Sequence, residues 1–227
     1  MREGRIEIDV EDGCIEALVV YPDDVGRWPP VILLGDGGGP AEVAATARRL
    51  ASHGFFVLAP QAPEEPLEEA FDAWLDYLAG ERLTDDGRVG ALGYGTGAGL
   101  ALQLAATHGE RIAAVAAFHP ARLAPESVHH LAGCLNAVVH LGYAAEDATW
   151  RAQDAADLEA ELRLAGVDFE VEVYPAKAGF AAPDGPDHDL RAAELHWRRL
   201  AELFRRTLVF PAPDTGAQPA TPPLSGL

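Results

Sequence analysis

The sequence has little cysteine, little positive charge and no long hydrophobic run. Two cysteines, Cys14 and Cys134, occur among 227 residues. Their spacing suits neither a zinc site nor a disulfide framework, so we interpret both as half-buried small apolar residues. The net charge of −19 has no basic cluster to offset it, which argues against nucleic acid and anionic membranes as partners. No run of about 18 apolar residues is present to span a membrane.

What the chain does have is enough apolar sequence for a full core. Hydrophobic residues make up 48% of it, and we expect a single domain over residues 1–210. The segment 211–227 is rich in Pro, Ala, Thr and Gly and has nothing to bury, so we expect it to be disordered. The start at Met1–Gly4 does not resemble a signal peptide, and we expect a cytoplasmic protein.

Short apolar strands alternate with amphipathic helices along the chain. The alternation at 6–10 and 14–21 around Asp12-Gly13 predicts a β-hairpin. Further strands are predicted at 31–34, 55–59, 89–92, 112–118, 137–141 and 169–174. Helices are predicted at 41–53, 67–79, 97–108, 152–165 and 190–208, and residues 121–135 are predicted to be irregular. This order predicts an α/β fold whose mostly parallel central sheet is covered by helices on both faces.

In sheets of this kind, ligands bind beyond the carboxyl ends of the strands. The loops that leave those ends should therefore share one rim, which would hold any site. The predicted rim loops are 35–40, 93–97, 119–122, 142–150 and 175–188.

The turn Gly93-Tyr94-Gly95-Thr96-Gly97 has the spacing of a nucleophile elbow, G-x-nucleophile-x-G, between a buried strand and a buried helix. Its nucleophile position holds Gly95, and a residue without a side chain cannot attack a carbonyl. The same residues with Ala98 also fit the dinucleotide fingerprint G-x-G-x-x-A. That motif needs an acid at the end of the next strand, which here ends at Phe118-His119, so nucleotide binding is a remote alternative.

Several stretches together resemble the dienelactone hydrolase family of α/β-hydrolases, over roughly residues 5–206. The resemblance is carried by their order and spacing. They are Val31–Gly35 with the acid after it, Leu50-Ala51, Gly54–Pro60, Val89–Tyr94, Ala117–His119, His140–Tyr143, Ala165–Asp168, Tyr174-Pro175 and Gly179-Phe180. The resemblance implies an α/β-hydrolase fold with an N-terminal β-hairpin.

The family uses a cysteine nucleophile at the elbow, a histidine base, an aspartate after a late strand and an acid near the first glycine loop. Carried over by position, the nucleophile falls on Gly95 and the histidine near Ala178, in a segment one residue short. The aspartate falls on Ala145 without gaps, or on Asp147 with a two-residue insertion, and the acid has its counterpart in Asp36. The resemblance thus implies a degenerate triad, with hydrolysis through an acyl-enzyme lost.

The oxyanion hole needs backbone N–H groups only, so it is expected to survive at Thr96 and near Gly37. Together with Asp36 it would stabilise an enolate during isomerisation, cyclisation or elimination of a small lactone, ester or polyketide-like ligand. Tyr94 and Phe180 are further candidates for substrate binding. We expect no cofactor and no metal.

Other interpretations remain open. The chain can be a binding protein without turnover, or a hydrolase that uses Thr96 as nucleophile and His119 or His188 as base. Lys177 is a candidate for binding an anionic ligand group. Structural roles are the alternatives for the same residues: Asp36 as a turn residue, Asp147 as a solvated loop residue and Thr96 as the start of a helix. The sequence does not fix the oligomeric state.

Overall fold

The structure is a computed structural model, and it describes residues 1–11, 13–36, 39–62, 67–85, 87–120, 125–147, 152–182 and 185–208. Within these ranges the side chains of 125–129, 152 and 154 are not described. The segment 211–227 lies outside the described residues, so the domain boundary at 210 and the disordered tail stay predictions.

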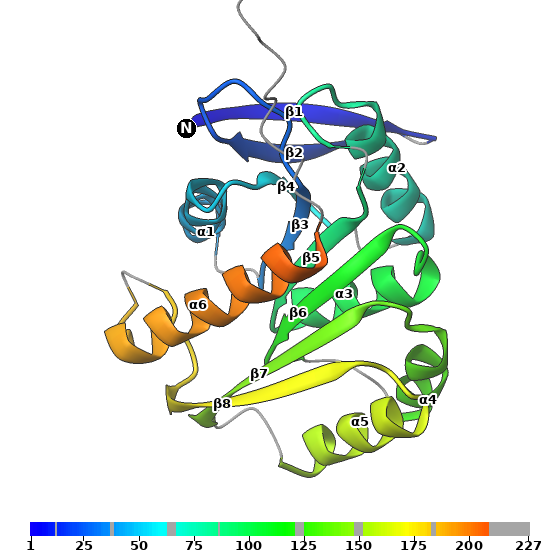
Figure 1. The fold of residues 1–227 in the computed structure, drawn as a ribbon, viewed down its shortest axis with the longest axis vertical. Coiled ribbons are helices and arrows are strands. Elements are labelled where there is room, and N and C mark those ends of the chain that lie inside the picture. The colour runs from blue at the N-terminus through cyan, green and yellow to red at the C-terminus, as the bar shows by residue number, and fades with distance from the viewer. Residues whose placement is uncertain are drawn as a thin grey trace, which may run out of the picture.

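The described strands form one eight-stranded sheet in the order β1-β2-β4-β3-β5-β6-β7-β8 (Figure 1). The strands are β1 Arg2–Val10, β2 Gly13–Tyr21, β3 Pro30–Leu34, β4 Phe56–Pro60, β5 Val89–Tyr94, β6 Ile112–Phe118, β7 Val138–Glu146 and β8 Phe169–Lys177. β2 runs antiparallel to both β1 and β4, and the other neighbours are parallel. The predicted hairpin and mostly parallel sheet are therefore confirmed.

Helices cover both faces of this sheet. They are α1 Pro40–Ser52, α2 Leu67–Gly80, α3 Thr96–Thr107, α4 Pro125–Cys134, α5 Ala152–Leu164 and α6 Leu190–Thr207. α1 and α6 pack on one face, and α2, α3, α4 and α5 lie on the other, so the sheet separates two apolar cores (Figure 1). Among the described helices, none is long and apolar enough to cross a membrane.

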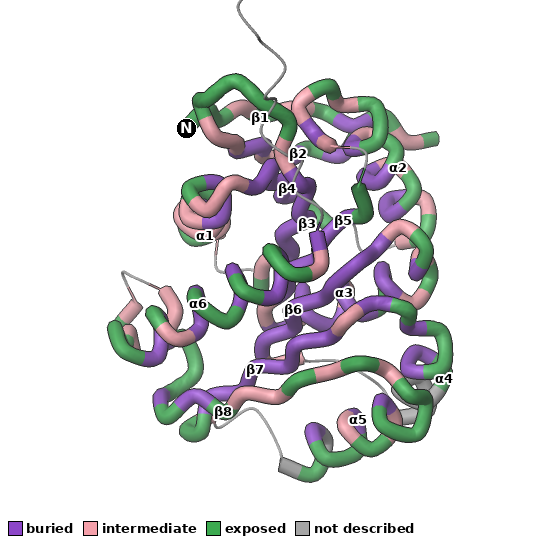
Figure 2. The backbone as a smooth tube through the Cα atoms, viewed as in Figure 1, coloured by how far each residue is buried: buried purple, intermediate pink, exposed green. Residues whose placement is uncertain are grey.

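The central strands are buried along their length because both faces are covered. β3 and β6 have no exposed residue, and Figure 2 shows the burial concentrated in the middle of the sheet. α6 begins where the Asp189 carboxylate accepts hydrogen bonds from the N–H groups of Arg191 and Ala192, an N-terminal cap. The predicted inward stripe of this helix is buried: Ala193, Trp197, Leu200 and Phe204.

Two sequence expectations are wrong. Part of the segment predicted to be irregular forms α4, whose Pro125 suits a first helical turn because proline has no N–H to leave unpaired there. The two cysteines are exposed, not half-buried. Cys14 precedes Ile15 in β2, where alternate residues face the core, so its side chain falls on the outer face. Cys134 is the last residue of α4.

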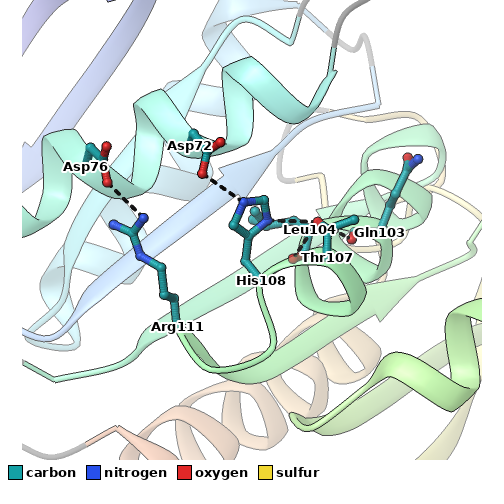
Figure 3. A network of polar contacts seen from close by, with 7 residues as sticks. All are labelled: Asp72, Asp76, Gln103, Leu104, Thr107, His108 and Arg111. Atoms are coloured by element: carbon teal, nitrogen blue, oxygen red, sulfur yellow. Dashed lines mark hydrogen bonds and ion pairs between the residues drawn. The ribbon is translucent and has the colours of Figure 1, made fainter.

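A polar network joins α2 to the turn before β6, at the amino ends of the parallel strands (Figure 3). His108 Nε2 lies 3.1 Å from Asp72 Oδ1, and Arg111 Nη1 lies 2.8 Å from Asp76 Oδ1. The second ring nitrogen, His108 Nδ1, contacts Thr107 Oγ1 at 2.8 Å. Both imidazole nitrogens are thus engaged, and the network ties a surface helix to the end of a core strand.

Candidate functional site

A cavity of about 210 Å³ lies at the carboxyl ends of the central parallel strands. It draws residues from the loops after β3, β5, β6, β7 and β8, as the rim prediction required. The lining residues are Leu33, Gly35, Asp36, Glu42, Val43, Thr46, Tyr94, Gly95, Phe118, His119, Asp147, Ala178, Gly179, Phe180, Ala181, Ala182 and His196.

Gly95 and Asp36 share the centre of this cavity. Gly95 has a φ of +52°, and a Cβ built there would overlap the carboxyl group of Asp36. The Gly95 N–H donates to the Phe118 carbonyl at 2.8 Å, which fixes the turn against β6. A carboxylate from the loop after β3 therefore stands where an elbow side chain would begin, and that turn tolerates only glycine without rearrangement.

The same carboxylate engages the first residue of α3. Asp36 Oδ1 accepts the backbone N–H of Thr96 at 2.9 Å and its hydroxyl at 3.3 Å. The expectation that this N–H waits for a substrate carbonyl is thus corrected, because a protein carboxylate already holds it. Gly37, the other expected donor, lies outside the described residues.

His119 and Asp147 form a pair across the ends of β6 and β7. His119 Nδ1 lies 3.0 Å from Asp147 Oδ2, and the aspartate side chain is only 2% exposed. The Ala144 N–H approaches the same nitrogen at 3.4 Å. We assign the proton to Nδ1 because the contact with the carboxylate is shorter and charge-assisted. Nε2 is then the nitrogen that can accept a proton.

The backbone of His119 is held in an unusual conformation. Its φ of +53° lies in the left-handed region of backbone conformation, which residues other than glycine rarely adopt. The His119 N–H donates to the Gly142 carbonyl at 2.9 Å, so β7 fixes this turn together with the Asp147 contact. Strain of this kind, held by surrounding bonds, is typical of residues placed for function.

The protonation of His119 reflects two opposing influences. Burial lowers its pKa below the usual value, and the negative charges of Asp147 and Asp36 act in the opposite direction. Burial prevails, so the imidazole is neutral at pH 7. A neutral imidazole whose orientation is fixed by a carboxylate is suited to accept a proton.

A second polar pair lines the cavity on the α6 side. Tyr94 Oη lies 2.9 Å from His196 Nε2. Burial holds the pKa of the His196 imidazole far below its usual range, at about 3, and raises that of the Tyr94 phenol. Both groups are therefore uncharged at pH 7, and Tyr94 keeps its hydroxyl proton.

Sequence reasoning did not identify His196 and Glu42 as lining residues. His196 lies three residues after Ala193 and four before Leu200, so it belongs to the inward stripe of α6. Helical spacing alone was enough to place it inside the fold. Glu42 lies in the first turn of α1 and carries no comparable signal.

Of the remaining predicted site residues, one lines the cavity and two lie outside it. Phe180 is buried and lines the cavity, with its ring 6.4 Å from that of His119. Lys177 is not among the lining residues, and its Nζ pairs with Asp187 Oδ1 at 3.1 Å on the surface. His188 is also outside the lining, and its Nδ1 lies 2.9 Å from the Phe180 carbonyl oxygen.

A larger groove of about 810 Å³ borders the cavity. Gly35 and Val43 line both spaces, and Thr96 lines the groove only. Its described walls include apolar residues of β2 and α3, such as Leu18 and Leu100. Among the described residues, no group of three or more His, Cys, Asp or Glu side chains is arranged to hold a metal ion.

Comparisons with known proteins agree with this architecture. The family model described as "Dienelactone hydrolase family" matches residues 61–208. A dienelactone hydrolase candidate from Klebsiella pneumoniae is 22% identical with a TM-score of 0.81, over 90% of this chain and 98% of that one. P91, a dienelactone hydrolase-like promiscuous phosphotriesterase from metagenomic libraries, is 22% identical with a TM-score of 0.78, over 92% and 99%.

More distant esterases share the fold as well. Est1E from Butyrivibrio proteoclasticus is 13% identical with a TM-score of 0.72, over 90% of this chain and 98% of that one. No curated protein matches the sequence. At such identities the structural likeness establishes the fold, and the chemistry has to be argued from the cavity itself.

Proposed function

This chain belongs to the dienelactone hydrolase family, and from that premise we propose that its cavity binds a small carbonyl compound and moves protons on it without an acyl-enzyme. The ligand class is a lactone, an ester or a polyketide-like compound. The reaction class is isomerisation, cyclisation or elimination, in which a proton leaves a carbon next to the carbonyl group.

The observation that supports this proposal most directly is the position of the Asp36 carboxylate over Gly95. A covalent route needs a nucleophilic side chain at the elbow, and that space is filled by a group from another loop. An aspartate attacking a carbonyl would form an anhydride, a less stable product than the ester it came from. Asp36 therefore serves better as a proton acceptor than as a nucleophile.

His119 is the proposed base. Its Nε2 takes the proton from the substrate carbon, and Asp147 stabilises the imidazolium that forms while it keeps the ring oriented. In an isomerisation the same nitrogen returns the proton to another carbon of the substrate. Atoms and charges balance in this cycle without a co-reactant.

The enolate formed in such a step needs a hydrogen-bond donor. Thr96 N–H is bound to a carboxylate in the structure, so it stabilises an oxyanion only after Asp36 moves or accepts a proton. Tyr94 lines the same cavity and keeps its proton, because its pKa is raised by burial. We assign the His196 ring proton to Nε2, which donates to Tyr94 Oη at 2.9 Å, so that the Tyr94 hydroxyl can donate to the substrate oxygen.

The volumes of the two spaces suggest how a ligand lies. The reacting group fits the cavity beside His119, and a larger apolar part extends past Val43 into the groove. Dry contact with Leu18 and Leu100 would then supply binding energy at a distance from the chemistry.

Hydrolysis with a relocated base is the second candidate, and the His119–Asp147 pair favours it. In this route His119 would activate a water molecule or a hydroxyl group for attack on the carbonyl carbon. The Asp36 carboxylate disfavours it more than it disfavours an enolate, because a tetrahedral oxyanion keeps its whole negative charge on oxygen whereas an enolate shares the charge with carbon.

The test measures both reactions on one sample. The protein is incubated in D₂O with a simple unsaturated lactone, and NMR follows deuterium entering the α-carbon while ring opening is recorded. p-Nitrophenyl acetate and intact mass spectrometry report ester hydrolysis and any acyl-enzyme.

We expect deuterium exchange to be lost in His119→Gln and retained in His108→Gln. His108 is the matched control because it also pairs with an aspartate, Asp72, at the other end of β6. Ester hydrolysis with a mass adduct would contradict the proposal. Hydrolysis that needs His119 or His188 would instead establish the second candidate, and binding of the lactone without either reaction would establish a binding protein.

A further inference from the structure

A groove of about 520 Å³ is lined by residues of α1 and α6 and by His53. These two helices lie on the same face of the sheet (Figure 1). None of the groove's lining residues lines the catalytic cavity. They include Arg49, His53, Trp197, Arg198 and Arg205. This groove is thus separate from the cavity of the proposed reaction.

Positive charge dominates this groove although the chain carries a net charge of −19. Four arginines line it against two glutamates. Arg49 is paired with Glu194 at 2.6 Å, and Glu202 lies 3.6 Å from Arg199, outside the groove. Arg206 is paired with Glu170 at 2.8 Å, so among the described residues Arg198 and Arg205 are the two groove arginines that no carboxylate neutralises.

Two of these arginines, Arg49 and Arg205, lie near His53, the C-terminal cap of α1. Arg205 Nη2 lies 3.5 Å from His53 Nδ1, which must accept because a guanidinium only donates. The His53 ring stacks on Trp197 with centroids 6.4 Å apart. The Arg49 guanidinium lies over the same indole, 4.7 Å from its centroid.

Two guanidinium groups thus flank one imidazole. Their effect is visible in its pKa, which is lowered first by burial and then by the charges of Arg205 and Arg49, with Glu194 acting in the opposite direction. Arg49 is already paired with Glu194, whereas Arg205 faces the imidazole without a carboxylate partner among the described residues, so an anion bound here would offset the Arg205 charge. An anion bound here would also favour the protonated imidazole, which then becomes a further donor.

We propose that this groove binds a phosphoryl dianion, supplied as inorganic phosphate or as the monoester of a small molecule. A phosphate presents more acceptor oxygens and more negative charge than a carboxylate, and each guanidinium can meet two of those oxygens. Arg205, Arg198 and Arg49 would hold the oxygens, and His53 would complete the site. The Trp197 ring is buried and lies beneath the Arg49 guanidinium, so it acts as a floor.

The positions of two arginines at helix ends offer a simpler explanation for the positive charge of the groove, and the experiment must distinguish it from phosphate binding. Arg49 lies in the last turn of α1 and Arg205 in the last turn of α6, where cations stabilise the free carbonyl groups. That effect does not account for Arg198, which lies in the middle of α6. If it were the whole explanation, phosphate would find no saturable site.

Isothermal titration calorimetry with inorganic phosphate and with phenyl phosphate, at constant ionic strength set by chloride, tests the proposal on the full chain. We expect saturable one-to-one binding that weakens at least tenfold in the double variant Arg198→Gln/Arg205→Gln. Arg191→Gln is the matched control, an exposed arginine in the first turn of the same helix that does not line the groove. It should leave the affinity unchanged.

NMR of the imidazole carbons gives a readout that folding alone does not move. The pKa of His53 should rise when phosphate is added to the native protein and stay constant in chloride. Binding of phenyl phosphate alone would identify an organic monoester as the ligand, whereas equal binding of both identifies the free anion. No saturable binding, an unmoved His53 pKa, or an equal loss of affinity in Arg191→Gln would overturn the proposal.

Discussion

Two histidine–aspartate pairs stand at the two ends of β6, and only one of them has the features of a reactive site. His108 precedes the strand and contacts Asp72 at 3.1 Å, and His119 follows it and contacts Asp147 at 3.0 Å. The distances are nearly equal. The surroundings differ: Asp72 is 65% exposed, whereas Asp147 is 2% exposed.

Position in the sheet therefore decides what such a pair can do. At the amino end, both nitrogens of His108 are engaged by Asp72 and Thr107, so the pair is a clamp (Figure 3). At the carboxyl end, His119 lines a cavity and Asp147 engages one of its nitrogens. The carboxyl ends of parallel strands gather loops, and those loops leave room for a ligand.

The largest expected effect comes from breaking the pair at the carboxyl end. His119→Gln should lower the rate of proton exchange on a lactone by about 10²–10⁴-fold, the usual contribution of general base catalysis. In the native protein the rate should rise with pH through a pKa below 6.5, because burial lowers the pKa of the base. NMR exchange rates measured from pH 4 to 8 check both, and an unchanged rate in His119→Gln would remove the assigned role.

The next effect is a loss of folding stability at low pH, caused by the buried His196 in the cavity at the carboxyl end. His196 is neutral in the fold with a pKa of about 3, against an ordinary value of 6.5. Between these values the unfolded chain binds the extra proton, so stability falls as pH drops below 6.5 and His196 contributes nothing above it. The loss approaches about 5 kcal/mol once the pH falls below the folded pKa, the order expected from the shift.

Urea unfolding of the native protein and of His196→Phe at pH 7 and pH 4 measures this term. The variant should lose less stability between the two pH values than the native protein does. His108→Gln, at the other end of β6, should keep the native pH dependence; if it flattens the curve as His196→Phe does, the assignment fails.

A smaller effect is expected at the turn beneath the site. Gly95→Ala should cost about 1–3 kcal/mol, because the new Cβ meets the Asp36 carboxylate and the backbone is left-handed there. In the double variant Gly95→Ala/Asp36→Gly, the stability lost to the overlap with Asp36 should be recovered, and the stability lost to the left-handed backbone should not. A double-mutant cycle by urea unfolding measures the two parts, and strict additivity would show that the groups do not meet.

The smallest effect belongs to the exposed pair. Asp72→Asn should lower stability by less than about 1 kcal/mol, since a largely exposed carboxylate interacts weakly with its partner. It should leave the exchange rate of a lactone unchanged. A loss of activity in this variant would mean that the two ends of β6 are coupled, which the comparison between them excludes.

Much of the fold was predictable because periodicity reports burial. The hairpin, the parallel strands and the inward stripe of α6 follow from apolar spacing that the structure confirms. α4 was missed because its apolar residues, such as Leu131 and Ala132, are too few to show a period. Boundaries were also less certain: β7 continues to Glu146, five residues beyond the predicted end.

The site was predictable as a set of residues but not as an arrangement. Asp36, His119 and Asp147 were each named as candidates from their places after strands. The contacts between them were not predictable. Asp147 meets His119 because β7 extends to Glu146, and the sequence spacing does not give that strand length. Lys177 was placed by its neighbourhood in the sequence, yet it pairs with Asp187 on the surface.

The class of the protein follows from its amino-acid sequence: the alternating elements, the glycine turn after β5 and the family are all legible there. Local propensity and periodicity are enough for these, because each is a property of neighbouring residues. The tertiary structure alone decided that the Asp36 carboxylate stands over Gly95 and that His119 meets Asp147. Those contacts join loops far apart in the chain, and only the register of the packed strands brings the loops together.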